Sequence, residues 1–357
     1  MQCVTPMFRV YNSSLKKDSN AIIVPRSRII DGLNWDPNYI RHCVDQFNEQ
    51  KAKGYDPTRV QTIACSYCWA CKLRKSAEWA SRIILECMES PWNYWLTLTY
   101  DDLHLPIYEQ FTDGEYIYDN DGTWNGTLEP EDVTRFINSL RKYYERKGIY
   151  NIRYFYCGEY GEKTARPHYH LCLFGAPLDP EQFYDLGQDP KNHYFHWKSK
   201  ELDKYWQHGF CDVYELEFSN AAYTARYTMK KIFNEPKSES EYAALGKIKE
   251  FVRMSRRPGI GMKYFEKNMD KIYDTDELIL KTCKGNVGVR KPPKAFDRKF
   301  QNLFPDKWEL ILDSRQKAAE RSNKLLKELT DATDKQLLIM KTEDIIRIGN
   351  NLPRILE

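Results

Sequence analysis

The chain has 357 residues, of which 41% are hydrophobic and 14% aromatic, and its formal net charge is +3 at pH 7. This length can bury one large hydrophobic core or two smaller ones. No apolar run approaches the ~20 residues of a transmembrane helix, and the N-terminus lacks the charged leader and apolar stretch of a secretory signal, so neither a membrane span nor export is expected.

The first 64 residues are expected to be irregular, apart from a short amphipathic stretch over residues 39–53. Three cysteines then follow at metal-ligand spacing: Cys65, Cys68 and Cys71. A closed structural zinc site needs four ligands, and Cys3 is a candidate for the fourth. A histidine in place of Cys3, an iron–sulfur cluster on the same thiolates, and three reduced cysteines without a metal are the alternatives.

The next elements follow from apolar periodicity. Residues 71–88 carry one apolar stripe at helical spacing and predict a helix. Residues 93–100 alternate, which predicts a strand with leucines on one face and threonines on the other. Residues 103–127 are rich in Asp, Gly and Tyr and predict a loop or surface hairpin. Pro130 then begins a helix that extends to about residue 147.

Strands alternate with helices in the rest of the chain. Strands are predicted at residues 151–157 and 168–174, a helix after Pro180, and a strand at residues 211–218. Two charged amphipathic helices are predicted at residues 307–329 and 334–348. This order indicates an α+β fold whose strands pair antiparallel, with a helical C-terminal extension.

A His-x-His pattern is the first candidate site. His168 and His170 flank one residue of a predicted strand, so both imidazoles point to the same face. The preceding predicted strand leads to Glu159, and a hairpin through residues 161–166 would place this carboxylate beside the two rings. The three side chains together could bind a metal ion, with Glu162 as the alternative third ligand. Two stacked surface histidines without a metal are the other interpretation.

A pair of tyrosines is the second candidate site. Tyr223 and Tyr227 are four residues apart in a predicted helix that follows Ser219-Asn220, so they share one helix face with Lys230 one turn on. A phenol with a pKa near ~10 is a weak nucleophile at neutral pH. It becomes effective when a metal polarises the phosphate and a cation favours the phenolate. Two core aromatic residues would show the same spacing.

Three segments together resemble the motifs of HUH endonucleases, and within them the replication initiators of gokushovirus-type microviruses, which are single-stranded DNA phages. These segments are residues 95–102, 158–174 and 223–231. The cysteine cluster and residues 254–261 also resemble this phage group. The resemblance implies a central five-stranded antiparallel sheet flanked by helices. Its parts would be an N-terminal segment with the cysteine cluster (1–90), the HUH core (91–265), and a basic linker with C-terminal helices (266–357).

The resemblance also implies a reaction. The enzyme nicks one strand of origin DNA, stays covalently attached to the 5′ phosphate, and later rejoins the displaced strand. His168, His170 and Glu159 would bind Mg²⁺ or Mn²⁺, because a phosphate and water need open coordination positions. Tyr223 or Tyr227 would attack the phosphate, with Lys230 as the nearby cation. Which tyrosine acts first stays open.

The basic residues indicate where DNA binds. A net charge of only +3 excludes a uniformly basic coat, so contacts are expected from local groups. The residues that we expect to touch DNA are Arg226, Lys231, Arg256 and Arg257. A phosphate-binding loop of the Gly-x4-Gly-Lys-Ser/Thr type is missing, so unwinding is expected from a host helicase in the bacterial cytoplasm. The alternatives are a non-catalytic single-stranded nucleic-acid binding protein and an HUH transposase or relaxase.

Overall fold

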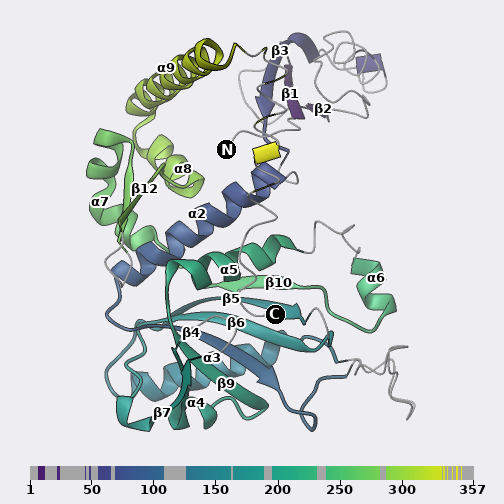
Figure 1. Ribbon diagram of the computed structural model, residues 1–357, viewed down its shortest axis with the longest axis vertical. Helices are drawn as coiled ribbons and strands as arrows, with labels where there is room; N and C mark the ends of the chain where they lie inside the picture. Colours follow the sequence, from purple (N-terminus) through teal and green to yellow (C-terminus); the bar gives the residue numbers. More distant parts are fainter. Residues whose placement is uncertain are drawn as a thin grey trace. The chain divides into compact units, whose positions relative to one another are not determined.

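The computed structural model divides the chain into two compact units, residues 1–75 with 313–352 and residues 76–312 with 353–357 (Figure 1). The structure describes residues 7–12, 22–24, 45, 48–49, 55–65, 69–107, 126–161, 164–188, 195–230, 239–281, 287–331, 333, 336, 340, 343–344 and 347. The two units are treated separately below.

The first unit contains a small sheet where irregular chain was expected. β1 (Met7–Asn12) lies between β2 (Ile22–Val24) and β3 (Tyr55–Ile63), and both pairings are antiparallel. The prediction of an irregular segment was therefore wrong. These strands are short and β3 pairs with a strand more than forty residues earlier, so no local hairpin signal marks them. Of the amphipathic stretch at residues 39–53, only residues 45, 48 and 49 are described, and they are helical.

The second unit is built on a large antiparallel sheet. Within the described ranges this sheet has seven strands, so the expectation of five was wrong. In their order across the sheet, the strands are β10 (Phe251–Met254), β5 (Arg153–Tyr160), β6 (Pro167–Phe174), β4 (Asn93–Tyr100), β9 (Gly209–Glu215), β8 (Phe195–Ser199) and β7 (Phe183–Gln188). The α+β class with antiparallel strands is confirmed.

The two extra strands, β7 and β8, form where a helix was predicted after Pro180. Asp179 and Pro180 do begin a helical turn, η3 (Pro180–Gln182), in which the Asp179 carboxylate accepts from the backbone N–H of Glu181. Phe183 then returns to extended backbone and starts the β7–β8 hairpin. A helix-start signal was therefore read correctly, but the aromatic residues after it favour a strand.

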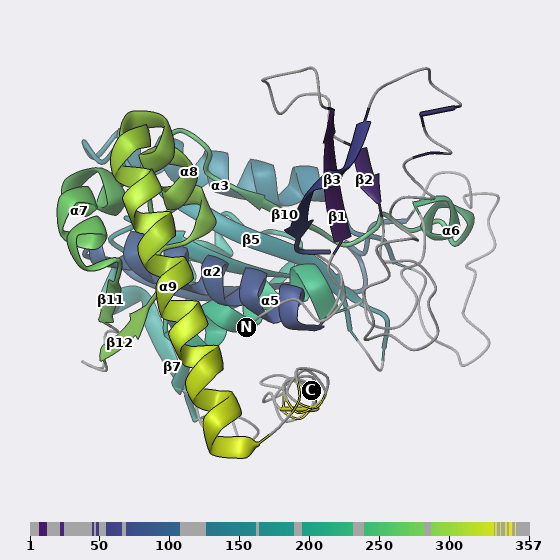
Figure 2. The same ribbon diagram turned by 90° about the horizontal axis from the view of Figure 1, so that it is seen from above.

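Each face of the sheet packs against helices through its own core. Helix α3 (Pro130–Glu145) covers one face, where its apolar stripe meets Leu96 and Leu98 of β4. On the other face, α5 (Phe218–Lys230) and the part of α2 (Trp69–Met88) from residue 76 onward lie side by side (Figure 1, Figure 2). Ser76 donates to the carbonyl of Ala222 across these two helices (3.3 Å). We call these the α3 face and the α5 face.

Several predicted elements are confirmed closely. Strand β4 covers the predicted residues 93–100, with the leucines on the α3 face and Thr97 and Thr99 on the α5 face. Helix α3 ends within two residues of the prediction. Strand β9 ends at Glu215, three residues before its predicted end. Asn220 stabilises this junction, because it accepts from Glu217 N and donates to Glu215 O (both 2.7 Å).

The remaining helices and strands complete the second unit and lead out of it. The short helices are α4 (Lys200–Asp203) and α6 (Glu239–Ala244). Residues 262–303, where no regular element was predicted, form α7 (Met262–Thr275), β11 (Leu278–Lys281), β12 (Val287–Arg290) and α8 (Lys294–Leu303). Helix α9 (Pro305–Thr330) confirms the first charged C-terminal helix. The second helix lies mostly outside the described residues. None of the described helices has the length and apolarity to cross a membrane.

Candidate metal centre and tyrosine helix

The β5–β6 hairpin brings the predicted metal ligands together. Glu159 of β5 lies directly opposite His168 of β6, and His170 follows two residues on, on the same face. The backbone N–H of Gly161 donates to Arg166 O (3.0 Å) and closes the turn. Nε2 of His168 lies 2.8 Å from Glu159 Oε1, and Nε2 of His170 lies 2.9 Å from the same oxygen. The alternative ligand, Glu162, lies outside the described residues.

Burial and charge keep this cluster in the form that binds metal. Glu159 and His170 are each 1% exposed. Burial acts to raise the pKa of the Glu159 carboxyl, but His170 and His168 outweigh it through charge and hydrogen bonds, so the pKa falls below its ordinary value. Burial also lowers the pKa of His170, against the attraction of Glu159. A carboxylate and a neutral imidazole are the protonation states that ligate a cation.

The hydrogen bonds of the two rings aim their second nitrogens at one point. Nδ1 of His168 lies 3.1 Å from the Arg166 carbonyl, which can only accept, so this nitrogen carries the proton. Nδ1 of His170 lies 3.2 Å from the Thr97 hydroxyl. Such contacts fix the ring orientation of metal-binding histidines.

The donor set fits a divalent cation. Nε2 of a neutral His168 is a lone pair facing the Glu159 carboxylate, and two acceptors this close need a proton or a cation between them. The other carboxylate oxygen, Oε2, is buried, and no described residue donates a hydrogen bond to it. The three ligand atoms lie within 4.8 Å of one another. Two imidazoles and one carboxylate form a set that leaves open positions on the metal.

Trp95 connects the metal centre to the tyrosine helix. Its indole stacks on the His170 ring, with centroids 4.9 Å apart and planes 8° from parallel. Its N–H donates to the Thr224 hydroxyl of α5 (2.8 Å). Tyr223, the preceding residue of α5, points its ring edge-on to His170 at 5.2 Å and is 4% exposed. The structure therefore brings Tyr223 to the predicted metal ligands.

Comparison with known proteins agrees with this arrangement. The family model of the replication-associated protein ORF2 matches residues 93–232. The replication-associated protein ORF2 of Spiroplasma virus 4 is 40% identical over 266 residues, which cover 73% of this chain and 75% of that protein. This chain belongs to the replication-associated protein family. The resemblance to phage replication proteins is thereby confirmed.

Two more distant relatives have the same kind of name. The replication-associated protein VP4 of Bdellovibrio phage phiMH2K is 26% identical over 273 residues, covering 73% of this chain and 76% of that protein. The replication-associated protein ORF4 of Chlamydia phage 1 is 26% identical over 268 residues, covering 75% and 59%. No solved structure matches the chain. The family match begins at β4 and ends just after α5, so it includes the metal-ligand cluster, Trp95 and Tyr223.

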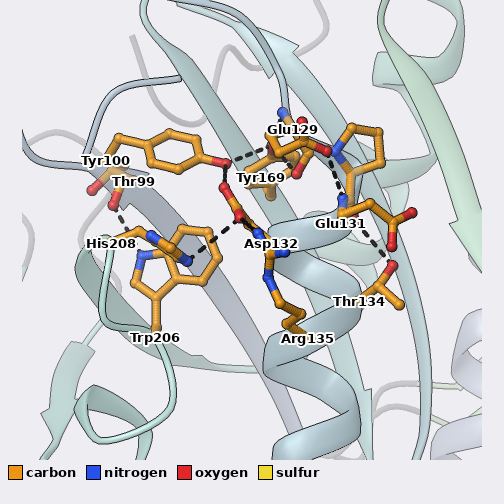
Figure 3. A network of polar contacts seen from close by, with 11 residues as sticks. Thr99, Tyr100, Glu129, Glu131, Asp132, Thr134, Arg135, Tyr169, Trp206 and His208 are labelled. Carbon is orange, nitrogen blue, oxygen red and sulfur yellow. Dashed lines mark hydrogen bonds and ion pairs between the residues drawn. The ribbon is translucent and has the colours of Figure 1, made fainter. Parts of the chain in front are cut away.

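A network on the α3 face supports the histidine strand from behind (Figure 3). Tyr169, between the two histidines, points away from them, and its hydroxyl accepts from the backbone N–H of Glu129 at the start of α3 (2.7 Å). The Tyr100 hydroxyl lies 3.0 Å from that of Tyr169 and donates to Asp132 (2.8 Å). Burial raises the pKa of both phenols above the usual range, so they stay protonated. The network therefore holds β4, β6 and α3 in one register.

Other predicted site residues are placed apart from the triad or lie outside the description. Arg256 and Arg257 are exposed and follow β10, whose pairing with β5 carries them to the end of the sheet away from Glu159. Six residues separate Glu159 from Arg153 at that end, which is about 20 Å along a strand. The side chains of Arg226, Tyr227 and Lys230, and the whole of Lys231, lie outside the described residues.

The cysteine cluster is described in part. Cys65 and Cys71 are buried, with their sulfur atoms 3.9 Å apart. Two thiolates on one tetrahedral zinc ion, at about 2.3 Å each, would be separated by about 3.8 Å. Arg74 reaches the Cys71 sulfur (3.9 Å) and favours its thiolate form. Cys3 and Cys68 lie outside the described residues, so the four-cysteine site stays a prediction.

Sequence reasoning missed Trp95, Thr97 and Thr224 as parts of the site. A usable signal existed for the first two, because the alternation of β4 already placed Thr97 on the face away from the leucines. Trp95 has the same parity and so the same face. Thr224 follows Tyr223 in a helix, and only the position of Trp95 in space gives its hydroxyl a role.

Proposed function

We propose that this protein is an HUH-type rolling-circle replication initiator of a small single-stranded DNA phage. It nicks one strand of origin DNA by transesterification, forms a covalent 5′-phosphotyrosine link, and later rejoins the displaced strand. The supporting observation is the position of Tyr223, whose ring lies 5.2 Å from that of His170 in the metal-ligand cluster. The family match and the phage relatives support the replication role.

Glu159, His168 and His170 would hold one divalent ion, Mg²⁺ or Mn²⁺. When bound, this ion would withdraw charge from the oxygens of the scissile phosphate. The protein's share is preparation: Arg166 O and Thr97 set the ring tautomers, and Trp95 keeps the His170 ring from rotating. Because Glu159 is buried, its charge is directed at the ligand and not lost to water.

The reaction balances without an external energy source. The phenolic oxygen of Tyr223 or Tyr227 forms a bond to phosphorus, the bond from phosphorus to the 3′ oxygen breaks, and the phenolic proton is exchanged for one on the departing 3′ hydroxyl. Lys230 is the cation that would favour the phenolate. One phosphodiester bond becomes another, so a 3′ hydroxyl can reverse the step and rejoin the strand. The second tyrosine would serve the next round.

DNA and host proteins are the proposed partners. Arg226 and Lys231 are next to the tyrosines in sequence and would bind phosphates close to the cut. Arg256 and Arg257, about 20 Å away along the sheet, would contact more distant DNA. A host helicase in the bacterial cytoplasm would unwind the duplex.

A nicking assay tests the proposal. Supercoiled replicative-form DNA of the parent phage is incubated with the protein and Mn²⁺ or with EDTA, and the products are digested and analysed by mass spectrometry. We expect open circles only with the metal, and a peptide from α5 that carries a nucleotide on tyrosine. Binding of the DNA without any metal-dependent nick, on both supercoiled and single-stranded forms, would instead indicate a non-catalytic binding protein.

A further inference from the structure

One row of side chains crosses four strands on the α5 face, and it starts in the metal centre. The strand pairings place Glu159 opposite His168, His168 opposite Thr99, and Thr99 opposite Phe210 of β9. Residues paired in neighbouring strands have side chains on the same face. Phe210 is therefore on the face of the metal ligands, two strand spacings or about 10 Å from His168.

Phe210 is unusual in this row because it is exposed. Half of its surface (52%) is open to solvent, whereas Tyr214, on the same face of the same strand, is 6% exposed. Tyr214 packs against Trp95 and belongs to the core under α5. The α5 face thus changes along β9 from a covered core to an open aromatic ring.

A lysine accompanies the open ring. Lys198 of β8 pairs with Asp212 of β9, and its ammonium lies 4.8 Å from the centre of the Phe210 ring. Asp212 is on the same face, between Thr97 and Lys198 in the strand order. A ring covered by a cation is often only a solubilised surface residue. Here the ring and cation continue the row that begins with Glu159 and His168, which gives them a partner of known chemistry.

We propose that Phe210 and Lys198 form a binding platform for a nucleotide next to the scissile phosphate. An unpaired base stacks on the Phe210 ring, and the Lys198 ammonium binds the neighbouring phosphate. The location of the scissile phosphate rests on the proposed function. Single-stranded DNA is the occupant because stacking on an exposed ring needs an unpaired base, and because a phosphate at the metal centre puts the adjoining nucleotide within reach of a ring about 10 Å away.

The test measures binding without chemistry. The affinity of the full-length protein for a fluorescein-labelled oligothymidylate is measured by fluorescence anisotropy in EDTA, where no cleavage occurs. We expect Phe210→Ala to weaken binding about tenfold and Phe210→Trp to stay within about twofold of the parent, since the larger ring still stacks. Thermal melting checks that both variants are folded.

The chain offers a matched control. Phe195 is 54% exposed on the neighbouring strand β8, but it alternates with His196 and so faces the other side of the sheet. Phe195→Ala should leave the affinity unchanged within about twofold. Lys198→Met should reduce the slope of log affinity against log salt by about 0.7, the share of one phosphate contact on a single strand.

Two results would overturn the platform. One is parental affinity in folded Phe210→Ala, and the other is an equal loss in Phe195→Ala. Neither depends on nicking. If no form of the protein nicks DNA but Phe210→Ala still loses affinity, the platform stands as a single-stranded DNA site and the initiator proposal fails. If the parent nicks and Phe210→Ala binds normally, the initiator proposal stands and the platform is wrong.

Discussion

The two faces of the central sheet use the same strand for opposite purposes. On β6, His168 and His170 face α5, while Tyr169 between them faces α3. On the α3 face, phenols and the Asp132 carboxylate bond to one another and to the start of a helix. On the α5 face, two imidazoles converge on one carboxylate oxygen, and Glu159 Oε2 is buried with no donor among the described residues.

The difference teaches how to separate a structural polar cluster from a binding one. Buried polar groups normally find hydrogen-bond partners within the protein. Tyr100 and Asp132 follow this rule, since a donor meets an acceptor. The triad does not, because its convergent atoms are acceptors once both imidazoles are neutral. Acceptors gathered around one point describe a site for a cation.

Removing one imidazole should have the largest effect. His170→Ala deletes a ligand and the ring on which Trp95 and Tyr223 pack. Nicking should fall by roughly a thousandfold or more, because the metal's contribution amounts to several kcal/mol. His168→Ala should act similarly with less structural disturbance, since His168 is partly exposed. The rate is measured with Mn²⁺, beside a circular dichroism melt. A variant that nicks at the parental rate would refute the metal assignment.

The tyrosine variants should divide the reaction between two residues. Tyr223→Phe and Tyr227→Phe remove only the hydroxyl, so ring packing against His170 is kept at position 223. We expect one variant to lose the first cleavage and the other to lose strand transfer, and the double variant to form no covalent adduct. Gel analysis of labelled DNA after protease treatment measures this. Full activity in the double variant would remove tyrosine from the mechanism.

Exchanging the carboxylate should weaken the metal more than the fold. Glu159→Gln keeps the shape but removes the charge between His168 and His170. The Mn²⁺ concentration for half-maximal nicking should rise about 10- to 100-fold, and nicking should recover at high Mn²⁺. Calorimetric titration of Mn²⁺ gives the same constant without DNA. An unchanged titration would move the third ligand elsewhere, with Glu162 the next candidate.

Loss of one hydroxyl should separate positioning from binding. Thr224→Val removes the acceptor of the Trp95 N–H, so the tyrosine helix is no longer fixed to the indole that stacks on His170. We expect kcat to fall about tenfold through misplacement of Tyr223, with Mn²⁺ and DNA affinities unchanged. Thr224→Ser should restore kcat. A purely structural role would instead show lower stability with normal kcat in the folded fraction.

The sequence predicted the site better than the frame around it. Glu159, His168 and His170 belong to one hairpin, and Tyr223 to the next helix of the same sheet layer, so period-two and period-3.6 patterns sufficed to bring them together. The β1–β3 pairing and the β7–β8 extension were missed, because they depend on partners far away in sequence or override a valid helix-start signal. Trp95 was missed because its role comes from stacking across strands, which no one-dimensional pattern records.

The smallest effect on chemistry is expected on the α3 face, and it completes the comparison. Tyr100→Phe removes the hydroxyl that joins Asp132 to Tyr169. Asp132 is 5% exposed and loses a charge-assisted bond, so the free energy of unfolding should fall by about 1–3 kcal/mol. The ligands of the metal centre lie on the other face, and nicking per folded molecule should stay within about twofold of the parent. Urea unfolding and single-turnover nicking measure the two quantities separately. A large loss of nicking at normal stability would show that the Tyr100 network takes part in the reaction and is not only a support for β6.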